Sequence, residues 1–224
     1  MIAVIHAHPY PRRSRACRAL VEAIAPIPGL EVRTLYDLYP DFDIDVTAEQ
    51  EALARAQLIV WLHPFYWYSV PGMLKHWFDK VLERGWAYGA GGHALAGKYC
   101  LWVPTVGGDE DTYADGNTNL RPFARYVEPV EQTARYCRMK WEEPFVVFGA
   151  QAKPDAALVA DAARLRARID AFAAARGWAA DGTGADGIPT PRTSDATAAR
   201  DRAAAVAASG VAASDEPEAG AGLS

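Results

Sequence analysis

Four bulky residues, Phe65-Tyr66-Trp67-Tyr68, stand together in a segment that the flanking sequence predicts to be a loop. The apolar run 57–62 before them indicates a buried strand. The segment 71–82 after them indicates a helix, with Pro71 in its first turn and Ser69 as its N-cap. Open α/β sheets bind ligands outside the carboxyl ends of their strands, where this loop would lie. Aromatic rings in such a loop favour a flat apolar partner, for example a flavin ring. The alternative is that these side chains only cover the edge of the sheet.

A basic loop follows the first apolar run of the chain, residues 2–7. It contains His8, three arginines and Ser14, and no acidic residue occurs before residue 22. Ser14 is a candidate N-cap for a helix whose apolar residues recur at helical spacing from Ala16 onward. The free N–H groups of a helix N-terminus, a hydroxyl and nearby guanidinium groups can together hold a phosphate. The alternative is a capped surface helix with solvated arginines.

Two adjacent glycines, Gly107 and Gly108, come soon after the apolar run 98–103, preceded by Thr105 and Val106. Glycines at the end of a strand let the backbone approach a ligand closely. The alternative is a simple turn. The chain thus has three loops, each after a predicted strand, whose residue types could bind a ligand.

Other features exclude several kinds of function. Residues 179–224 contain seven acidic and three basic residues, so they carry −4 of the net charge of −5. The remainder is nearly neutral, which argues against a nucleic-acid binder. The three cysteines lack zinc spacing and the acidic loop 38–45 lacks the pattern of a calcium loop, so we expect no metal site. Residues 89–94 match G-x-G-x-x-A, but a predicted helix precedes them and a strand follows, the reverse of a dinucleotide fingerprint.

Apolar runs and helical periodicities alternate along the chain. This alternation predicts an α/β fold: a flavodoxin-like, doubly wound, five-stranded parallel sheet with strand order 2-1-3-4-5. In this order the loops after strands 1, 3 and 4 converge on one crevice. Strands are predicted at 2–7, 30–36, 57–62, 98–103 and 143–150, and helices at 14–27, 47–56 (opened by a capping box at Thr47), 71–82, 120–136 and 155–176.

The C-terminal segment 179–224 has no aromatic residue, and 15 of its 46 residues are alanine. It has too little apolar area to offset the cost of ordering, so we expect a dispensable, disordered tail after a domain at 1–178. The N-terminus lacks the basic region of a signal peptide, and no apolar run approaches the roughly 20 residues needed to span a bilayer. We therefore expect a cytoplasmic protein, at most peripheral to a membrane.

Longer motifs resemble the NAD(P)H dehydrogenase (quinone) family of FMN flavoproteins, and within it the ancillary subunits of glutathione-regulated potassium-efflux systems. The resemblance covers roughly residues 1–178. Its motifs are Ala7-His8-Pro9-Tyr10-Pro11, Leu38-Tyr39-Pro40-Asp41-Phe42, Ala48-Glu49-Gln50-Glu51-Ala52-Leu53, Trp67-Tyr68-Ser69-Val70-Pro71 and Gly85-Trp86-Ala87-Tyr88-Gly89.

The resemblance implies an FMN-dependent homodimer that reduces quinones with NAD(P)H, with a potassium-efflux transporter at the inner membrane as a further partner. Position by position, it implies that the FMN phosphate meets His8, Ser14, Arg15, Ala16 and Cys17. It implies that the flavin ring lies against Phe65, Tyr66, Trp67, Tyr68, Thr105, Val106, Gly107 and Gly108. These residues belong to the three loops chosen above on physical grounds.

The sequence departs from the resembling family at one place. Related mammalian quinone reductases have a tyrosine and a histidine shortly after the double glycine, which support the charge on the reduced ring. Tyr113 matches the tyrosine, but no histidine occurs after His93, and the corresponding place holds residues 117–119. Tyr113 is therefore the candidate catalytic residue, without an imidazole behind it.

We expect an FMN-dependent NAD(P)H:quinone oxidoreductase. One alternative is a regulatory flavoprotein subunit of a transporter with little turnover of its own. Another is a flavodoxin-type electron carrier, which the near-neutral, aromatic site disfavours. We also expect a dimer interface at 86–93 and the helix from Pro71, because Trp77, Trp86 and Tyr88 exceed what one small core needs.

Overall fold

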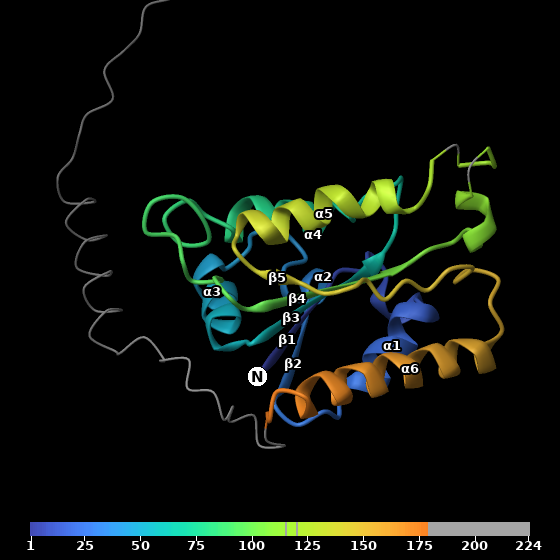
Figure 1. Cartoon of the computed structure of the whole chain (residues 1–224), viewed down its shortest axis with the longest axis horizontal. Coiled ribbons are helices and arrows are strands. Elements are labelled where there is room, and N and C mark those ends of the chain that lie inside the picture. Colours follow the sequence, from blue (N-terminus) through green and yellow to red (C-terminus); the bar gives the residue numbers. More distant parts are fainter. Residues whose placement is uncertain (115, 120, 179–224) are drawn as a thin grey trace, which may run out of the picture. The chain divides into compact units, whose positions relative to one another are not determined.

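Five strands form one parallel sheet in the order β2-β1-β3-β4-β5 (Figure 1). The computed structural model describes residues 1–114, 116–119 and 121–178, so the tail predicted at 179–224 lies outside the described residues. The flavodoxin-like strand order predicted from the sequence is confirmed. The strands are β1 (Ile2–His6), β2 (Leu30–Thr34), β3 (Leu58–Pro64), β4 (Tyr99–Thr105) and β5 (Lys140–Trp141).

Helices cover both faces of the sheet. In Figure 1, α3, α4 and α5 lie on one side of the strands, and α1 and α6 lie on the other. β1 and β3 are buried at every position because side chains on both of their faces meet helices. The helical elements are η1 (Pro11–Arg13), α1 (Ala16–Ile24), α2 (Leu35–Leu38), α3 (Val46–Arg55), α4 (Gly72–Val81), η2 (Glu110–Tyr113), α5 (Ala124–Tyr136) and α6 (Asp155–Ala174).

The fifth strand was predicted wrongly at 143–150. Regular pairing with β4 is confined to β5, although the predicted segment continues alongside β4. There the N–H of Phe145 donates to the carbonyl of Trp102 and that of Val147 to the carbonyl of Pro104. A parallel ladder needs a bond from residue 104 between these two, and Pro104 has no N–H to give. The ladder is therefore interrupted there, and Val147 forms only an isolated bridge to Thr105. β5 itself ends earlier, because Pro144 also lacks the N–H that would continue the ladder, and the register shifts by one residue between Trp141 and Val147.

The ends of other elements also differ from the prediction. Asp45, and not Thr47, caps α3, because its carboxylate accepts from the N–H of Ala48 at 2.9 Å. α5 begins at Ala124 rather than at residue 120. The predicted second strand ends early, because residues 35–38 form the helical turn α2. This turn brings Leu35 and a residue four positions later, Tyr39, into the core.

Glu49 on α3 is a fully buried carboxylate that joins α3 to β2, to α4 and to the residue that follows α2. Its Oε1 accepts from two guanidinium nitrogens of Arg33, at 2.8 and 2.6 Å, and from the Tyr39 hydroxyl at 2.6 Å. Its Oε2 accepts from Trp77 Nε1 on α4 at 2.9 Å. The buried charge is thus paired and hydrogen-bonded, as burial of an ion requires. This network fixes α4 relative to β2 and α3.

None of the three aromatic residues that we expected at a dimer interface is fully exposed on the surface. Trp77 is completely buried, and Trp86 and Tyr88 are half-buried against the same core. The prediction failed for Trp77 because its indole N–H bonds Glu49, a contact between segments far apart in the sequence. In the described part of the chain, no helix has the length and apolar character to cross a membrane.

Candidate functional site

A cavity of about 490 Å³ opens at the carboxyl ends of β1, β3 and β4. This is the crevice that the predicted strand order places there. Eight of the predicted binding residues line it: His8, Ser14, Arg15, Ala16, Phe65, Tyr66, Thr105 and Gly107. The other predicted site residues, Cys17, Trp67, Tyr68, Val106, Gly108 and Tyr113, are not among those that line it.

The start of α1 forms the polar end of the cavity. Ser14 Oγ accepts from the N–H of Cys17 at 3.1 Å, so Ser14 makes the capping bond expected of it. The Cys17 side chain is buried beneath the helix start, with Sγ 3.3 Å from Thr105 Oγ1. Burial raises the pKa of the thiol to about 11, so Cys17 stays protonated at neutral pH. Its side chain ties α1 to β4 and is no nucleophile.

Two arginines line this end of the cavity, and they differ in whether the guanidinium is already paired with an acidic side chain. The guanidinium of Arg15 donates to Asp155 at 2.5 Å and to the carbonyl of Lys153 at 2.8 Å. Arg15 therefore fixes the loop that leads into α6. Arg13 lies on the exposed turn η1 and has no ion-pair partner among the described residues. Its guanidinium is the one that could meet an anion here.

Four lining residues were missed by the sequence reasoning: Arg13, Pro64, Ala150 and Gln151. Ala150 and Gln151 follow the segment that runs beside β4. The same rule that selected the loops after strands 1, 3 and 4 could have found them, because this segment ends at the same edge of the sheet.

His8 presents a defined tautomer to the cavity. The N–H of Tyr10 donates to His8 Nδ1 at 3.0 Å, so Nδ1 carries no proton. Burial lowers the pKa of His8 below its ordinary value, so the ring is neutral at pH 7. The proton is therefore on Nε2, which is a hydrogen-bond donor.

The aromatic segment forms a tight turn rather than an N-cap. Tyr66 and Ser69 exchange two backbone hydrogen bonds, at 3.1 and 2.9 Å. α4 begins at Gly72 with Pro71 at its N-cap, so Ser69 does not cap the helix and Pro71 lies just before its first turn, unlike the prediction. The two central residues, Trp67 and Tyr68, have φ angles of 47° and 63°. Bulky residues rarely adopt positive φ, and such strain concentrates at functional sites. Trp67 is 93% exposed and Tyr68 48% exposed.

Tyr113 lies in an aromatic cluster behind Phe65, which we define as Phe65, Tyr68, Trp102, Tyr113, Phe123, Tyr126 and Phe148. Its ring meets Phe65 edge to face at a centroid distance of 6.4 Å. The residue is only 8% exposed, so Tyr113 is not a solvated loop residue. Burial, followed by the neighbouring Tyr68 and Tyr126, raises its pKa, so the hydroxyl keeps its proton.

His63 supports this cluster from the end of β3. Burial lowers its pKa to about 4, so the ring is neutral. Nδ1 donates to the carbonyl of Pro64 at 2.9 Å, which leaves Nε2 free to accept from Trp102 Nε1 at 2.6 Å. Both ring nitrogens of His63 are therefore hydrogen-bonded within the core, whereas His8 Nε2 can donate a hydrogen bond into the cavity.

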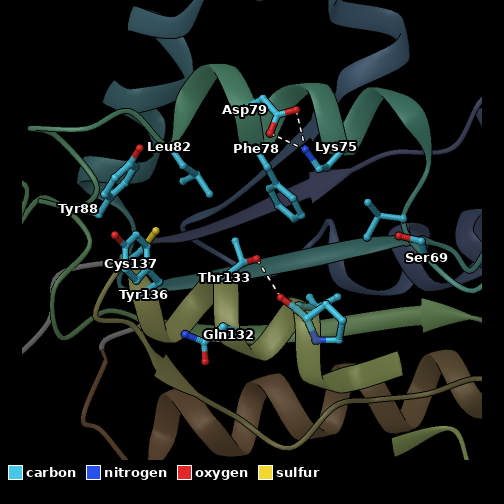
Figure 2. A pocket seen from close by; sticks show the side chains of 13 residues that line it. Ser69, Lys75, Phe78, Asp79, Leu82, Tyr88, Gln132, Thr133, Tyr136 and Cys137 are labelled. Carbon is cyan, nitrogen blue, oxygen red and sulfur yellow. Dashed lines mark hydrogen bonds and ion pairs between the residues drawn. The ribbon is translucent and has the colours of Figure 1, made fainter. Parts of the chain in front are cut away.

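A second, larger cavity of about 600 Å³ lies between α4 and α5 (Figure 2). Its lining is largely apolar, with Phe78, Leu82 and Val130 among its residues. Figure 2 shows the ion pair between Lys75 and Asp79 along α4 at its side. Among the described residues, none from the loops after β1 and β4 lines this groove, so its size does not make it the candidate site.

The smaller cavity combines two kinds of binding surface. One end offers helix N–H groups, a hydroxyl, a donor imidazole and the Arg13 guanidinium, which suit a phosphate. The other end offers Phe65 and Tyr66, which suit a flat ring. A phosphorylated ring compound matches both ends together.

Comparison with known proteins agrees with this geometry. The family described as flavodoxin-like fold matches residues 1–169. The glutathione-regulated potassium-efflux system ancillary protein KefF of Salmonella typhi is 50% identical over 173 residues, 77% of this chain and 97% of that protein. General stress protein 14 of Treponema denticola, solved in complex with FMN, is 31% identical, with a TM-score of 0.72 over 76% of this chain and 98% of that one. An NADPH-quinone reductase from P. pentosaceus is 24% identical, with a TM-score of 0.68 over 75% and 96%, which shows a shared fold.

Proposed function

This chain belongs to the flavodoxin-like fold family, and we propose from that premise that it is an FMN-dependent oxidoreductase that transfers electrons from NAD(P)H to a quinone-like acceptor. The observation that carries the proposal is that one cavity is lined both by the start of α1, with Ser14 and His8, and by the aromatic rings of Phe65 and Tyr66. The FMN complex of the Treponema denticola relative supports the choice of cofactor. The sequence motifs that resemble the quinone-reducing family support the choice of acceptor.

The residues present fit FMN. The volume of about 490 Å³ is within the usual range for cofactor pockets. His8 Nε2, Ser14, Ala16 and Arg13 would hold the phosphate, and Phe65, Tyr66, Thr105 and Gly107 would meet the ring. Gly107 has only Gln151 Oε1 near the place of an added Cβ, at 3.7 Å, so the backbone there is open to a close approach.

Bound FMN would supply the chemistry of taking two electrons from NAD(P)H and passing them to the acceptor. The chain binds and orients the reactants. Its aromatic cluster excludes water from one side of the cavity. Tyr113 holds a proton at its hydroxyl oxygen, where it can donate a hydrogen bond to charge that develops beside Phe65.

We expect purified protein to release FMN, and not FAD, when it is heated. The cavity offers one phosphate-binding helix start and no dinucleotide fingerprint, so it suits a mononucleotide. Chromatography of the released flavin identifies it, and anaerobic addition of NADPH should bleach the visible absorption of the intact protein. Release of FAD would exclude the proposed cofactor, and a spectrum unchanged by both NADPH and NADH would exclude the proposed activity.

Two neighbouring arginines give a matched control for the location of the site. Arg13→Ala should weaken FMN binding about tenfold, because it removes a charge-assisted hydrogen bond to the phosphate. Arg12→Ala should change binding much less, because Arg12 is exposed on the same turn but is not among the cavity residues. Titration of flavin-stripped protein with FMN, followed by flavin fluorescence, measures both. Equal effects would place the phosphate elsewhere.

We also propose that the chain acts as an ancillary subunit of a potassium-efflux transporter. The KefF relative matches nearly its whole length at 50% identity, and its name gives that role. This role would place the protein in the cytoplasm, at the inner face of the membrane that holds the transporter. Regulation by docking and quinone reduction can coexist in one flavoprotein.

We further propose a homodimer that uses the groove between α4 and α5. The groove has an apolar floor, and its helix α4 carries Lys75 and Asp79 one turn apart. A second copy related by a two-fold axis across α4 would bring its Asp79 to Lys75, and its Lys75 to Asp79. This charge complementarity and the apolar floor favour a second copy of the chain as the occupant.

A charge placed in the groove should produce monomers. Tyr136 lines the groove and is 61% exposed, so Tyr136→Glu should disrupt packing between two copies without disturbing the core. Val159→Glu is the matched control, because Val159 is 64% exposed on α6, beyond the opposite face of the sheet. Light scattering at micromolar concentration should show a dimer for wild type and Val159→Glu, and a monomer for Tyr136→Glu. A monomeric wild type would refute the proposal.

A further inference from the structure

A chain of hydrogen bonds beside the aromatic turn has a fixed direction. Asn119 Nδ2 bonds the backbone carbonyl of Thr112 at 3.0 Å and Thr112 Oγ1 at 2.9 Å. The Thr112 hydroxyl in turn donates to the carbonyl of Asp109 at 2.6 Å. The remaining amide atom, Asn119 Oδ1, lies 3.2 Å from the hydroxyl of Tyr68.

The chemistry of these groups allows one direction only. A backbone carbonyl can only accept, so the Thr112 hydroxyl donates its hydrogen to the carbonyl of Asp109. The Thr112 carbonyl and hydroxyl oxygens are then both acceptors toward Asn119, so the Asn119 NH₂ group must face Thr112. The Asn119 oxygen must therefore face Tyr68. Because that oxygen can only accept, the Tyr68 hydroxyl must donate its single hydrogen to it.

Tyr68 is thereby left as a hydrogen-bond acceptor toward any ligand. Its ring is held in place, stacked on Tyr126 at 5.2 Å between centroids and edge-on to Phe65 at 6.4 Å. The residue is nevertheless 48% exposed, and its hydroxyl keeps acceptor lone pairs that the bond to Asn119 does not use. It shares a four-residue turn with Tyr66, which lines the cavity.

We propose that Tyr68, polarised by Asn119, accepts a hydrogen bond from the carboxamide NH₂ group of the nicotinamide ring and so selects NAD(P)H over the acceptor. The inference deepens the proposed function and rests on it. An oxidised quinone carries carbonyl oxygens, which only accept, so Tyr68 can give it no hydrogen bond. The carboxamide carries two N–H donors and can satisfy the Tyr68 lone pair. Tyr68 is a binding residue for the nucleotide, and Asn119 is its positioning residue.

The test compares the binding of two oxidised nucleotides to the FMN-loaded protein by calorimetry, without turnover. One is NADP⁺, and the other is its 3-acetylpyridine analogue, in which a methyl ketone replaces the carboxamide and no N–H donor remains. The NAD⁺ pair is measured in parallel. Wild type should bind the carboxamide about fivefold more tightly, the usual effect of one neutral hydrogen bond. Tyr68→Phe should bind both members of a pair equally.

Two further variants make the result specific. Asn119→Ala should reduce the discrimination, because the Tyr68 hydroxyl can then turn its hydrogen toward the ligand. Tyr126→Phe is the matched control and should keep the discrimination, because the Tyr126 hydroxyl is directed at the backbone carbonyl of Asn119, at 3.3 Å.

The outcomes separate this inference from the proposed function. Equal binding of both nucleotides by wild type, or unchanged discrimination in Tyr68→Phe or Asn119→Ala, would overturn the inference and leave the oxidoreductase proposal standing. If flavin is bound but neither NADP⁺ nor NAD⁺ binds, and neither NADPH nor NADH bleaches the flavin, the proposed function itself fails.

Discussion

Tyr113→Phe should slow reduction of the bound flavin by NAD(P)H tenfold or more, with an expected loss near a hundredfold. The substitution removes a hydroxyl and keeps the ring that packs among Phe65, Phe123 and Tyr126. One donor aimed at developing negative charge in a dry site contributes about 3 kcal/mol, which corresponds to this loss. Stopped-flow absorbance under anaerobic conditions measures the rate constant directly.

The loss should be confined to the chemical step. A hydrogen bond that strengthens only as charge develops lowers the rate without weakening nucleotide affinity. FMN should stay bound, because the proposed phosphate and ring contacts come from residues of other loops, such as Ser14 and Tyr66. Tyr126→Phe is the matched control within the same cluster, since its hydroxyl already donates to Asn119. A Tyr113→Phe rate within twofold of wild type would show that the hydroxyl plays no part in the reaction.

Glu49→Ala should lower the free energy of unfolding by about 3–5 kcal/mol, the usual cost of removing one member of a buried ion pair. The change leaves three donors without their acceptor: the Arg33 guanidinium, the Tyr39 hydroxyl and the Trp77 indole N–H. The Arg33 side chain is 14% exposed, so water reaches it poorly. Urea denaturation followed by fluorescence measures the difference.

Glu31→Ala provides the comparison, because Glu31 pairs with the same guanidinium but is 32% exposed. Water reaches the Glu31 carboxylate, and ion pairs near the protein surface contribute about 1 kcal/mol or less, so this variant should be destabilised much less than Glu49→Ala. Equal destabilisation by both substitutions would mean that burial of Glu49 does not set its contribution.

Local sequence patterns predicted the sheet well because a strand that is buried on both faces is apolar at nearly every position. The continuous apolar runs of β1 and β3 are of this kind. Given the strand order, the loops after strands 1, 3 and 4 had to meet at one edge, and eight of the residues chosen in them line one cavity. Their binding roles remain predictions.

Partners distant in the sequence decided what periodicity could not. Arg13 and Arg15 both line the cavity, yet Asp155 pairs with Arg15, while Arg13 has no ion-pair partner in the described part of the chain. Glu49 lies within the predicted capping box at 47–50, but its carboxylate is held in the core by Arg33 and Trp77.

The sequence by itself determined the fold class, the order of the strands and the loops that meet at the site, because these follow from local burial patterns and from the handedness of parallel connections. Only the tertiary structure decided which polar groups remain free to bind. A donor or acceptor is no longer available to a ligand once folding brings a hydrogen-bond partner within about 3 Å of it. Residues that lie this close in the fold can be far apart in the sequence, so sequence spacing does not predict the pair. The direction of the bond from Tyr68 to Asn119, set by Thr112 and Asp109, is the clearest instance.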